Sequence, residues 1–156
     1  MNKISRKVEY ALMALTHMSQ KHQGDLTTAK EVAETFGAPF DVVSRVLQRL
    51  AQNEVLRAEQ GVNGGYMIIK DLGRVSFYEV MTMVLGPMSI AKCLYDDSSC
   101  EMAASCNISD PIQVLNSKLE SFYQSVTIRE LIEPTMTGRE LSLHLQMQAK
   151  SNRGEN

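Results

Sequence analysis

Apolar residues recur at intervals of three and four along the first part of the chain, and this spacing predicts three helices. The first is expected over residues 5–21. The second follows Thr28, which forms a capping-box pattern with Glu31, and it should end at Gly37. The third should begin near Pro39 and run to about residue 53. The positions expected to face the core are Val8, Leu12, Leu15, Met18, Val32, Ala33, Phe36, Val42, Val43, Val46, Leu47 and Leu50.

The pattern changes to short strands after the third helix. Two apolar-leaning runs, 55–59 and 66–70, flank a turn at 60–65 that contains three glycines, and together they predict a β-hairpin. Two short helices joined by a glycine-containing turn, behind a longer scaffold helix, form a helix-turn-helix. A helix-turn-helix followed by a glycine-tipped hairpin is a winged helix.

The second half of the chain predicts a helix, a long loop and a longer helix. A capping box at Ser76 and Glu79 opens a helix that should end at Gly86. Residues 88–109 show no periodicity, which is typical of a functional or disordered loop. A long helix should follow, with Asp110 as its N-cap and Pro111 as its first helical residue. Its heptad-like stripe, which nothing local covers, consists of Ile112, Leu115, Leu119, Phe122 and Val126.

The expected fold class is therefore mainly α, a winged helix-turn-helix with a two-stranded wing and a long dimerisation helix. Residues 1–86 should form the DNA-binding domain and 87–110 a cysteine-containing, cluster-binding loop. Residues 111–150 should hold the dimerisation helix and a C-terminal helical segment, with short capped turns at 127–130 and 137–140. Residues 151–156 should be a disordered tail.

Composition narrows the class of protein. With 156 residues, 44% of them hydrophobic, the chain can form one compact domain with an appended element, and it is not wholly disordered. No apolar run approaches the ~20 residues that span a bilayer, and no secretory signal pattern is present. We therefore expect a cytoplasmic protein with no membrane partner.

The charge is unevenly distributed along the chain. A net charge of -2 argues against a protein that coats nucleic acid along its whole surface. However, residues 1–74 carry 10 Lys and Arg against 8 Asp and Glu, whereas residues 75–156 carry 6 against 10. The mildly basic half contains the helix-turn-helix and the wing.

The outward face of the third predicted helix has the side chains of a DNA-reading surface. Arg45 and Arg49 can reach guanine edges or phosphates, and Gln48 can pair with adenine. Asp41 and Ser44, at the N-terminal end, can read cytosine or contact the backbone. A merely solvated face would look similar, but the capped helix before it and the hairpin after it favour DNA binding.

The wing and the start of the second helix complete the candidate DNA-binding set. Arg57 stands at the base of the hairpin, where it can meet phosphate, and Asn63 and Gly64 stand at the tip, where they can enter the minor groove. An ordinary Asn-Gly turn would have the same residues. Thr28, at the start of the second helix, is the remaining member.

The aperiodic loop contains all three cysteines of the chain, Cys93, Cys100 and Cys106. An odd number does not suggest a disulfide framework. Thiolates grouped in a loop suit zinc or an iron–sulfur cluster. Their spacing is wider than the tight knuckles of structural zinc sites, which favours a cluster. Three unrelated cysteines are the remaining alternative.

This order of elements resembles the iron–sulfur cluster regulator family of winged helix-turn-helix repressors. The likeness covers roughly residues 1–133, and its specific parts are the wing Gly61-Val62-Asn63-Gly64-Gly65-Tyr66 and the cysteine loop. The resemblance implies a homodimer on a palindromic operator in double-stranded DNA, with residues 111–126 as the dimer helix. It also implies a [4Fe-4S] cluster, with [2Fe-2S] as the alternative, bound by Cys93, Cys100 and Cys106.

The chain also departs from the family pattern. The first gap between cysteines is one residue longer than in the best-known regulator of the family, and Ser109 stands where that regulator has a histidine. In the nitric-oxide-sensing relatives, a carboxylate on the first helix of the opposite subunit is a ligand, and Glu9 is the matching residue here. A solvent-facing role is the alternative for Glu9. Gln60 replaces an arginine that often precedes the wing glycine.

The predicted function is an iron–sulfur-cluster-dependent transcriptional regulator that represses its targets and senses nitric oxide, redox stress or iron and cluster status. No nucleophile–base pair or phosphate-binding glycine motif is present, so an enzyme is not expected. The alternatives are a thiol-redox or zinc-dependent regulator without a cluster, and a cluster carrier that acts through protein contacts.

Overall fold

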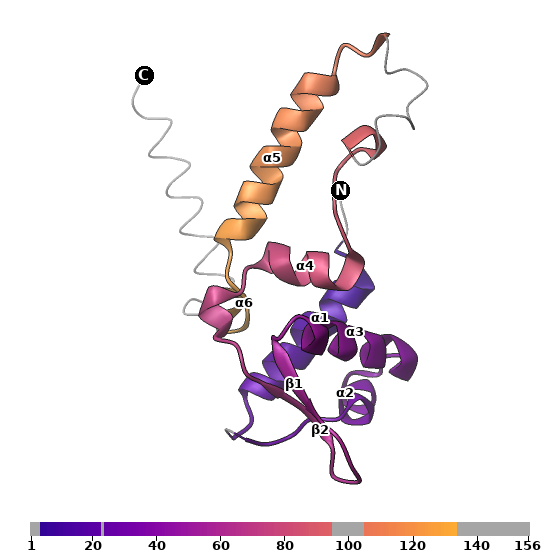
Figure 1. The fold of residues 1–156 in the computed structure, drawn as a ribbon, viewed down its shortest axis with the longest axis vertical. Coiled ribbons are helices and arrows are strands. Elements are labelled where there is room, and N and C mark those ends of the chain that lie inside the picture. Colours follow the sequence, from indigo (N-terminus) through magenta and orange to yellow (C-terminus); the bar gives the residue numbers. More distant parts are fainter. Residues whose placement is uncertain (1–3, 23, 95–104, 134–156) are drawn as a thin grey trace.

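The computed structural model describes residues 4–22, 24–94 and 105–133 (Figure 1). Within them the chain is a mainly α winged helix with a two-stranded antiparallel wing, which confirms the expected fold class. The predicted segments at 134–150 and 151–156 lie outside the described residues, as does Cys100. The elements are α1 (Arg6–Ser19), α2 (Ala29–Phe36), α3 (Phe40–Gln52), β1 (Leu56–Glu59), β2 (Gly65–Ile68), the 3-10 turn η1 (Leu72–Arg74), α4 (Phe77–Leu85), the 3-10 turn η2 (Lys92–Leu94), α5 (Ser109–Ser125) and α6 (Ile128–Ile132).

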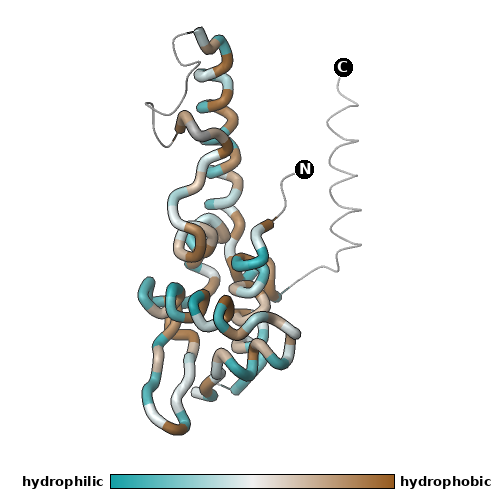
Figure 2. The backbone as a smooth tube through the Cα atoms, turned by 90° about the vertical axis from the view of Figure 1, so that its right-hand side faces the viewer, coloured by the Kyte–Doolittle hydropathy of each residue, from teal (hydrophilic) through white to brown (hydrophobic). Residues whose placement is uncertain are grey.

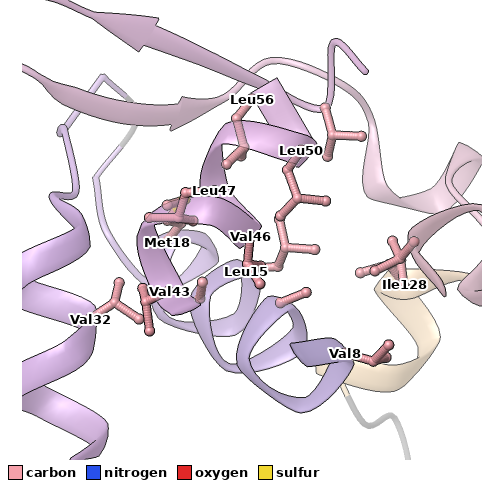
Figure 3. Packing of buried hydrophobic residues seen from close by; sticks show 14 of the residues in the cluster. Val8, Leu15, Met18, Val32, Val43, Val46, Leu47, Leu50, Leu56 and Ile128 are labelled. Carbon is pink, nitrogen blue, oxygen red and sulfur yellow. The ribbon is translucent and has the colours of Figure 1, made fainter. Parts of the chain in front are cut away.

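The core forms where α1 packs against α3 and α4. Val8 and Leu15 of α1 are fully buried, and so are Leu47 and Leu50 of α3 (Figure 3). Ala11 and Ala14, which the apolar stripe did not include, are also fully buried on α1. Small side chains at these positions let neighbouring helices approach closely, so they belong to the core as much as the larger residues do.

Two details of α2 differ from the prediction. Phe36 is 40% exposed instead of facing inward, and its ring meets the edge of the His17 ring at 5.8 Å between centroids. The Thr28 hydroxyl accepts a hydrogen bond from the Glu31 N–H, but the reciprocal half of the capping box is missing. The Glu31 carboxylate instead lies 2.7 Å from His17 Nε2, on α1, and 2.6 Å from Lys21 Nζ, just after α1. These two partners hold the carboxylate away from the Thr28 backbone.

The wing pairs Leu56 with Ile68 at one end and Glu59 with Gly65 at the other. Its tip requires glycine at position 64, because a Cβ there would lie 2.4 Å from the Glu59 carbonyl oxygen. Thr27 fixes the other edge, since its N–H and carbonyl exchange hydrogen bonds with Tyr66 at 2.9 and 2.8 Å. The wing is therefore attached directly to the start of α2.

The long helix α5 projects away from the winged helix (Figures 1 and 2). It starts at Ser109, after Ile108, so the expectation of Asp110 as N-cap and Pro111 as the first helical residue was wrong by two positions. Several backbone N–H groups at a helix start have no partner, so a proline within this turn does not fix the first residue. No residue of α5 is buried, and no helix of the described residues is long and apolar enough to span a membrane.

The C-terminal end of α5 is anchored to the winged helix by a short backbone junction. Val126 accepts a hydrogen bond from the Phe77 N–H, and Val75 accepts one from the Ile128 N–H, both at 2.8 Å. Ile128 is fully buried. Complete capping boxes at Ser76 and Thr127 begin the two helices that leave this junction, as their sequence patterns predict.

The carboxylates of these capping boxes make the stability of the junction depend on pH. Partial burial alone would raise the pKa of Glu79, but hydrogen bonds from Ser76 and the nearby Lys70 ammonium outweigh it and lower the pKa. Hydrogen bonds from Thr127 lower the pKa of Glu130. A lowered pKa in the folded state stabilises the protein above the ordinary carboxylate pKa, and this stabilisation is lost as the pH falls through the lowered value.

We therefore expect the free energy of unfolding to fall as the pH drops from about 5 to about 3, and to fall less steeply in the double variant E79Q/E130Q. Glutamine can still accept the capping hydrogen bonds but does not titrate in this range. Urea unfolding at a series of pH values measures the slope. The control is E34Q, which neutralises an exposed carboxylate 3.8 Å from Lys30. An equal slope in wild type and E79Q/E130Q would contradict this expectation.

Candidate DNA-binding surface and cysteine segment

The polar residues predicted for the reading face are on the outer side of α3. Asp41, Arg45, Gln48 and Arg49 are exposed and Ser44 is half-exposed, whereas the opposite side of the helix lies in the core. Gln48 Nε2 donates a hydrogen bond of 3.4 Å to Ser44 Oγ, one turn earlier. The structure therefore presents these five side chains to solvent together.

The turn before α3 sets the direction of this helix. Gly37 ends α2 with a φ of 62°, in the left-handed region that glycine adopts readily. Pro39, the N-cap of α3, is extended with a ψ of 122°. The two helices pack against one another across this turn, which leaves Phe40 and Asp41, the first two residues of α3, exposed.

The wing brings a second group of candidate residues to the surface. Arg57 Nε lies 2.8 Å from Glu59 Oε1, and its Nη2 donates to Met67 Sδ at 3.0 Å. Asn63 is exposed at the tip, beside Gly64. The hairpin loop extends past α2 and α3 at the lower end of the molecule in Figure 1. Thr28 is exposed as well, with its hydroxyl oxygen occupied as the N-cap of α2.

Residues 93–106, the cysteine segment, are described only at their two ends. Cys93 lies in η2 and Cys106 lies just before α5, and both are half-exposed free thiols. Among residues 4–22, 24–94 and 105–133, no three His, Cys, Asp or Glu side chains are grouped so that they could hold a metal ion. Glu9, the fourth candidate ligand, is on α1, where its carboxylate pairs with Arg6 Nη1 at 2.7 Å.

A hollow of about 530 Å³, lined mainly by apolar residues, lies where α1, α4, residues 88–90 and α5 meet. Its walls include Val8, Phe77, Met81, Leu119 and Tyr123. The rings of Phe77 and Tyr123 meet edge to face at 5.7 Å, which is where α5 contacts α4.

Asn116 of α5 holds the backbone just before the cysteine segment, and the sequence pattern did not identify this residue. Its side-chain oxygen accepts a hydrogen bond from the Ile90 N–H at 3.1 Å, and its Nδ2 donates to Glu120 at 2.8 Å. The prediction for α5 considered only apolar positions. A polar residue that neighbours Leu115 in the sequence and holds a loop backbone has no signature in such a pattern.

The apolar stripe predicted for α5 is only partly covered. Ile112, Leu119 and Val126 are half-buried, whereas Leu115 and Phe122 are 47% and 60% exposed. Val114 on the same helix is 55% exposed. A row of exposed large apolar side chains on one projecting helix is typical of a surface that binds another protein.

Known proteins share this fold. The structure of CymR, the global cysteine regulator of B. subtilis, has a TM-score of 0.64 and 22% identity, over 87% of this chain and 100% of that chain. The oxidized form of Staphylococcus aureus CymR has a TM-score of 0.63 and 17% identity, over 87% and 100%. T. potens IscR has a TM-score of 0.59 and 14% identity, over 90% and 96%. At these identities the likeness shows the fold alone.

The family itself is shown by a direct match to the sequence. The model of the Rrf2 family, described as an iron-dependent transcriptional regulator, matches residues 4–134. This match includes the helix-turn-helix, the wing, the cysteine segment and α5, and it confirms the family expected from the motifs. The chain belongs to the Rrf2 family of DNA-binding transcriptional regulators.

Proposed function

We propose that this regulator is a homodimeric repressor whose DNA affinity depends on an iron–sulfur cluster. The observation that carries the proposal is the position of the three cysteines along the chain, from Cys93 in η2 to Cys106 just before α5. The segment thus joins directly to the helix with the exposed apolar surface. The signal is nitric oxide, redox stress or the supply of iron and clusters.

The chemistry of the donor groups fits a cluster. Thiolates are the usual ligands of iron–sulfur clusters, and Cys93 and Cys106 are accessible free thiols at the two ends of the segment. Cys100 is the third thiol, and Glu9 of a second copy is the proposed oxygen ligand. The family model is described as iron-dependent, and IscR is among the structures with this fold. A bound [4Fe-4S] cluster, or alternatively [2Fe-2S], would supply a group sensitive to nitric oxide and oxygen.

The residues around the segment provide a route from the cysteines to the DNA-binding surface. Asn116 ties the backbone of Ile90, three residues before Cys93, to the middle of α5. The C-terminal end of α5 leads into the backbone junction at Phe77 and Ile128. A rearrangement of the cysteine segment would therefore reorient α5 relative to α3. Such a change shifts the population between conformations that fit the operator and conformations that do not.

A specific observation favours one alternative. The free, half-exposed thiols of Cys93 and Cys106 could respond to oxidation without a cluster, and the fold is shared with CymR, for which an oxidized form is known. This thiol-redox regulator would need only two of the three cysteines. A zinc-dependent regulator would give a colourless protein without iron or sulfide in the first experiment below, and a cluster carrier would give DNA binding that does not depend on Arg45 or Arg49.

We expect each of C93A, C100A and C106A to abolish the visible absorption and the iron and sulfide content of anaerobically reconstituted protein. A cluster requires all three thiolates, because thiolates are the strong ligands of its irons and two of them with one carboxylate bind it too weakly for isolation. S109A is the matched control within the same region and should retain the cluster. A colourless, iron-free wild type would overturn the cluster, and operator binding that needs only two cysteines would indicate the thiol-redox alternative.

E9Q tests the fourth ligand in the same reconstituted protein. Loss of the carboxylate should leave three thiolate ligands, so we expect a cluster that is bound but lost faster in air. The control is E34Q, which removes a carboxylate from the exposed side of α2. Equal loss rates in wild type and E9Q would assign Glu9 to its ion pair with Arg6 alone.

For DNA binding, we expect R45A and R49A each to weaken operator affinity by about 1–3 kcal/mol where the guanidinium contacts a base. Where it contacts phosphate, the slope of log affinity against log salt should fall by about one. Fluorescence anisotropy over a range of salt concentrations measures both. K118A removes the same charge from α5 and should change neither. Unaltered binding by both arginine variants would point to a carrier that acts through protein contacts.

For the dimer, we expect L115D to produce monomers and to reduce operator affinity at least tenfold, because a buried, unpaired carboxylate is costly in an apolar interface. The control Q124D adds the same charge on the side of the helix opposite to Leu115. Sedimentation equilibrium measures the oligomeric state. If L115D remains a dimer, the exposed stripe of α5 is not the interface.

A further inference from the structure

Phe40 is an exposed aromatic residue at the first position of α3. Its side chain is 53% accessible, although the neighbouring helix positions Val43 and Leu47 are fully buried. In the described part of the chain, Phe40 takes part in none of the ring-to-ring contacts. The fold therefore leaves much of this ring in contact with water, on the helix that a winged-helix protein inserts into DNA.

The position of Phe40 on the helix aligns it with two polar candidates. Phe40, Ser44 and Gln48 are four residues apart, so they follow one another along one side of α3. The hydrogen bond from Gln48 to Ser44 shows that these two side chains share that side, and Phe40 lies one helical turn before Ser44. The second row along the helix contains Asp41, Arg45 and Arg49. The reading face thus has one row with an apolar end and one row that is charged throughout.

We propose that Phe40 is a specificity-determining residue that contacts the C5-methyl group of a thymine in the major groove. N-terminal residues of a recognition helix are the ones that meet base edges. The thymine methyl is the apolar feature of the major-groove edge, and phenylalanine is among the side chains that contact it. Other bases present polar groups there, and a phenyl ring would remove them from water without a hydrogen bond in return.

The neighbouring residues favour the same kind of base pair. Gln48 can bond bidentately to adenine, and Ser44 can bond to any base. The row would therefore read adenine and thymine, while Arg45 and Arg49 address guanine or phosphate. This inference rests on α3 being the reading helix of the proposed regulator.

Phe36 provides a matched comparison on the preceding helix. It is 40% exposed, but its ring contacts the edge of the His17 ring, which gives it a structural partner within the protein. It ends α2 and does not belong to the reading row. An effect of exposed aromatic surface in general should therefore appear in F36A as well as in F40A, whereas a thymine contact should appear only in F40A.

The experiment uses the full chain and an operator selected from random duplexes by the wild-type protein. Each thymine of the operator is then replaced in turn by deoxyuridine, which removes only the methyl group. We expect one position in each half-site at which this replacement weakens wild-type binding about fourfold, the equivalent of one buried methyl group. F40A should bind the thymine and deoxyuridine operators equally, F40L should retain part of the discrimination, and F36A should discriminate as wild type does.

The possible failures are distinguishable. If wild type selects no sequence, the proposed function fails. If wild type binds a selected operator but no thymine methyl matters, or if F40A discriminates as wild type does, the Phe40 contact is overturned. If F40A weakens binding to both operators equally and keeps the discrimination, Phe40 has a structural role only. Thermal unfolding of F40A and F36A checks that both variants are folded.

Discussion

The backbone junction between residues 75–77 and 126–128 is the constraint on which the placement of the long helix depends. α5 has no fully buried residue, although Tyr123 and Val126 pack against the core. Two backbone hydrogen bonds of 2.8 Å and the fully buried Ile128 add to this contact at its C-terminal end. Asp71 reinforces the junction, because it lies 2.7 Å from Arg129 Nη2 and also accepts a hydrogen bond from the Gly73 N–H.

The same junction lies between the winged helix and the long helix that follows the cysteine segment. On one side, Val75 and Phe77 belong to the compact winged helix, whose core continues through α1 to α3. On the other side, Val126 is the C-cap of α5. Asn116, in the middle of the same helix, accepts a hydrogen bond from the backbone of Ile90, three residues before Cys93. The wing has a separate attachment through Thr27 and Tyr66. The wing and α3 are therefore both attached to the winged-helix core, and the cysteine segment reaches that core by two routes, through α5 and the junction and through the chain that follows α4.

The fold was predictable where local rules act alone, and less so where tertiary contacts decide. Both complete capping boxes, the glycine tip of the wing and the buried stripe of α3 follow from residue type and spacing. Phe36 and Glu31 did not follow, because His17 on another helix engages both side chains. For the candidate site, exposure on α3 was predictable from periodicity. The role of Asn116 was not, since it depends on a loop that packs beside α5.

Because α5 is attached at its C-terminal end, a small rotation there produces a large displacement at its N-terminal end. A helix of its length extends about 25 Å from the junction, so a rotation of about ten degrees there displaces the far end by about 4 Å. Conversely, if the N-terminal end of α5 next to Cys106 moves by several ångströms, α5 turns by only a small angle relative to the winged helix. In the proposed twofold assembly, each copy would contribute this angle. The two angles together would set the separation of the two α3 helices relative to successive turns of DNA.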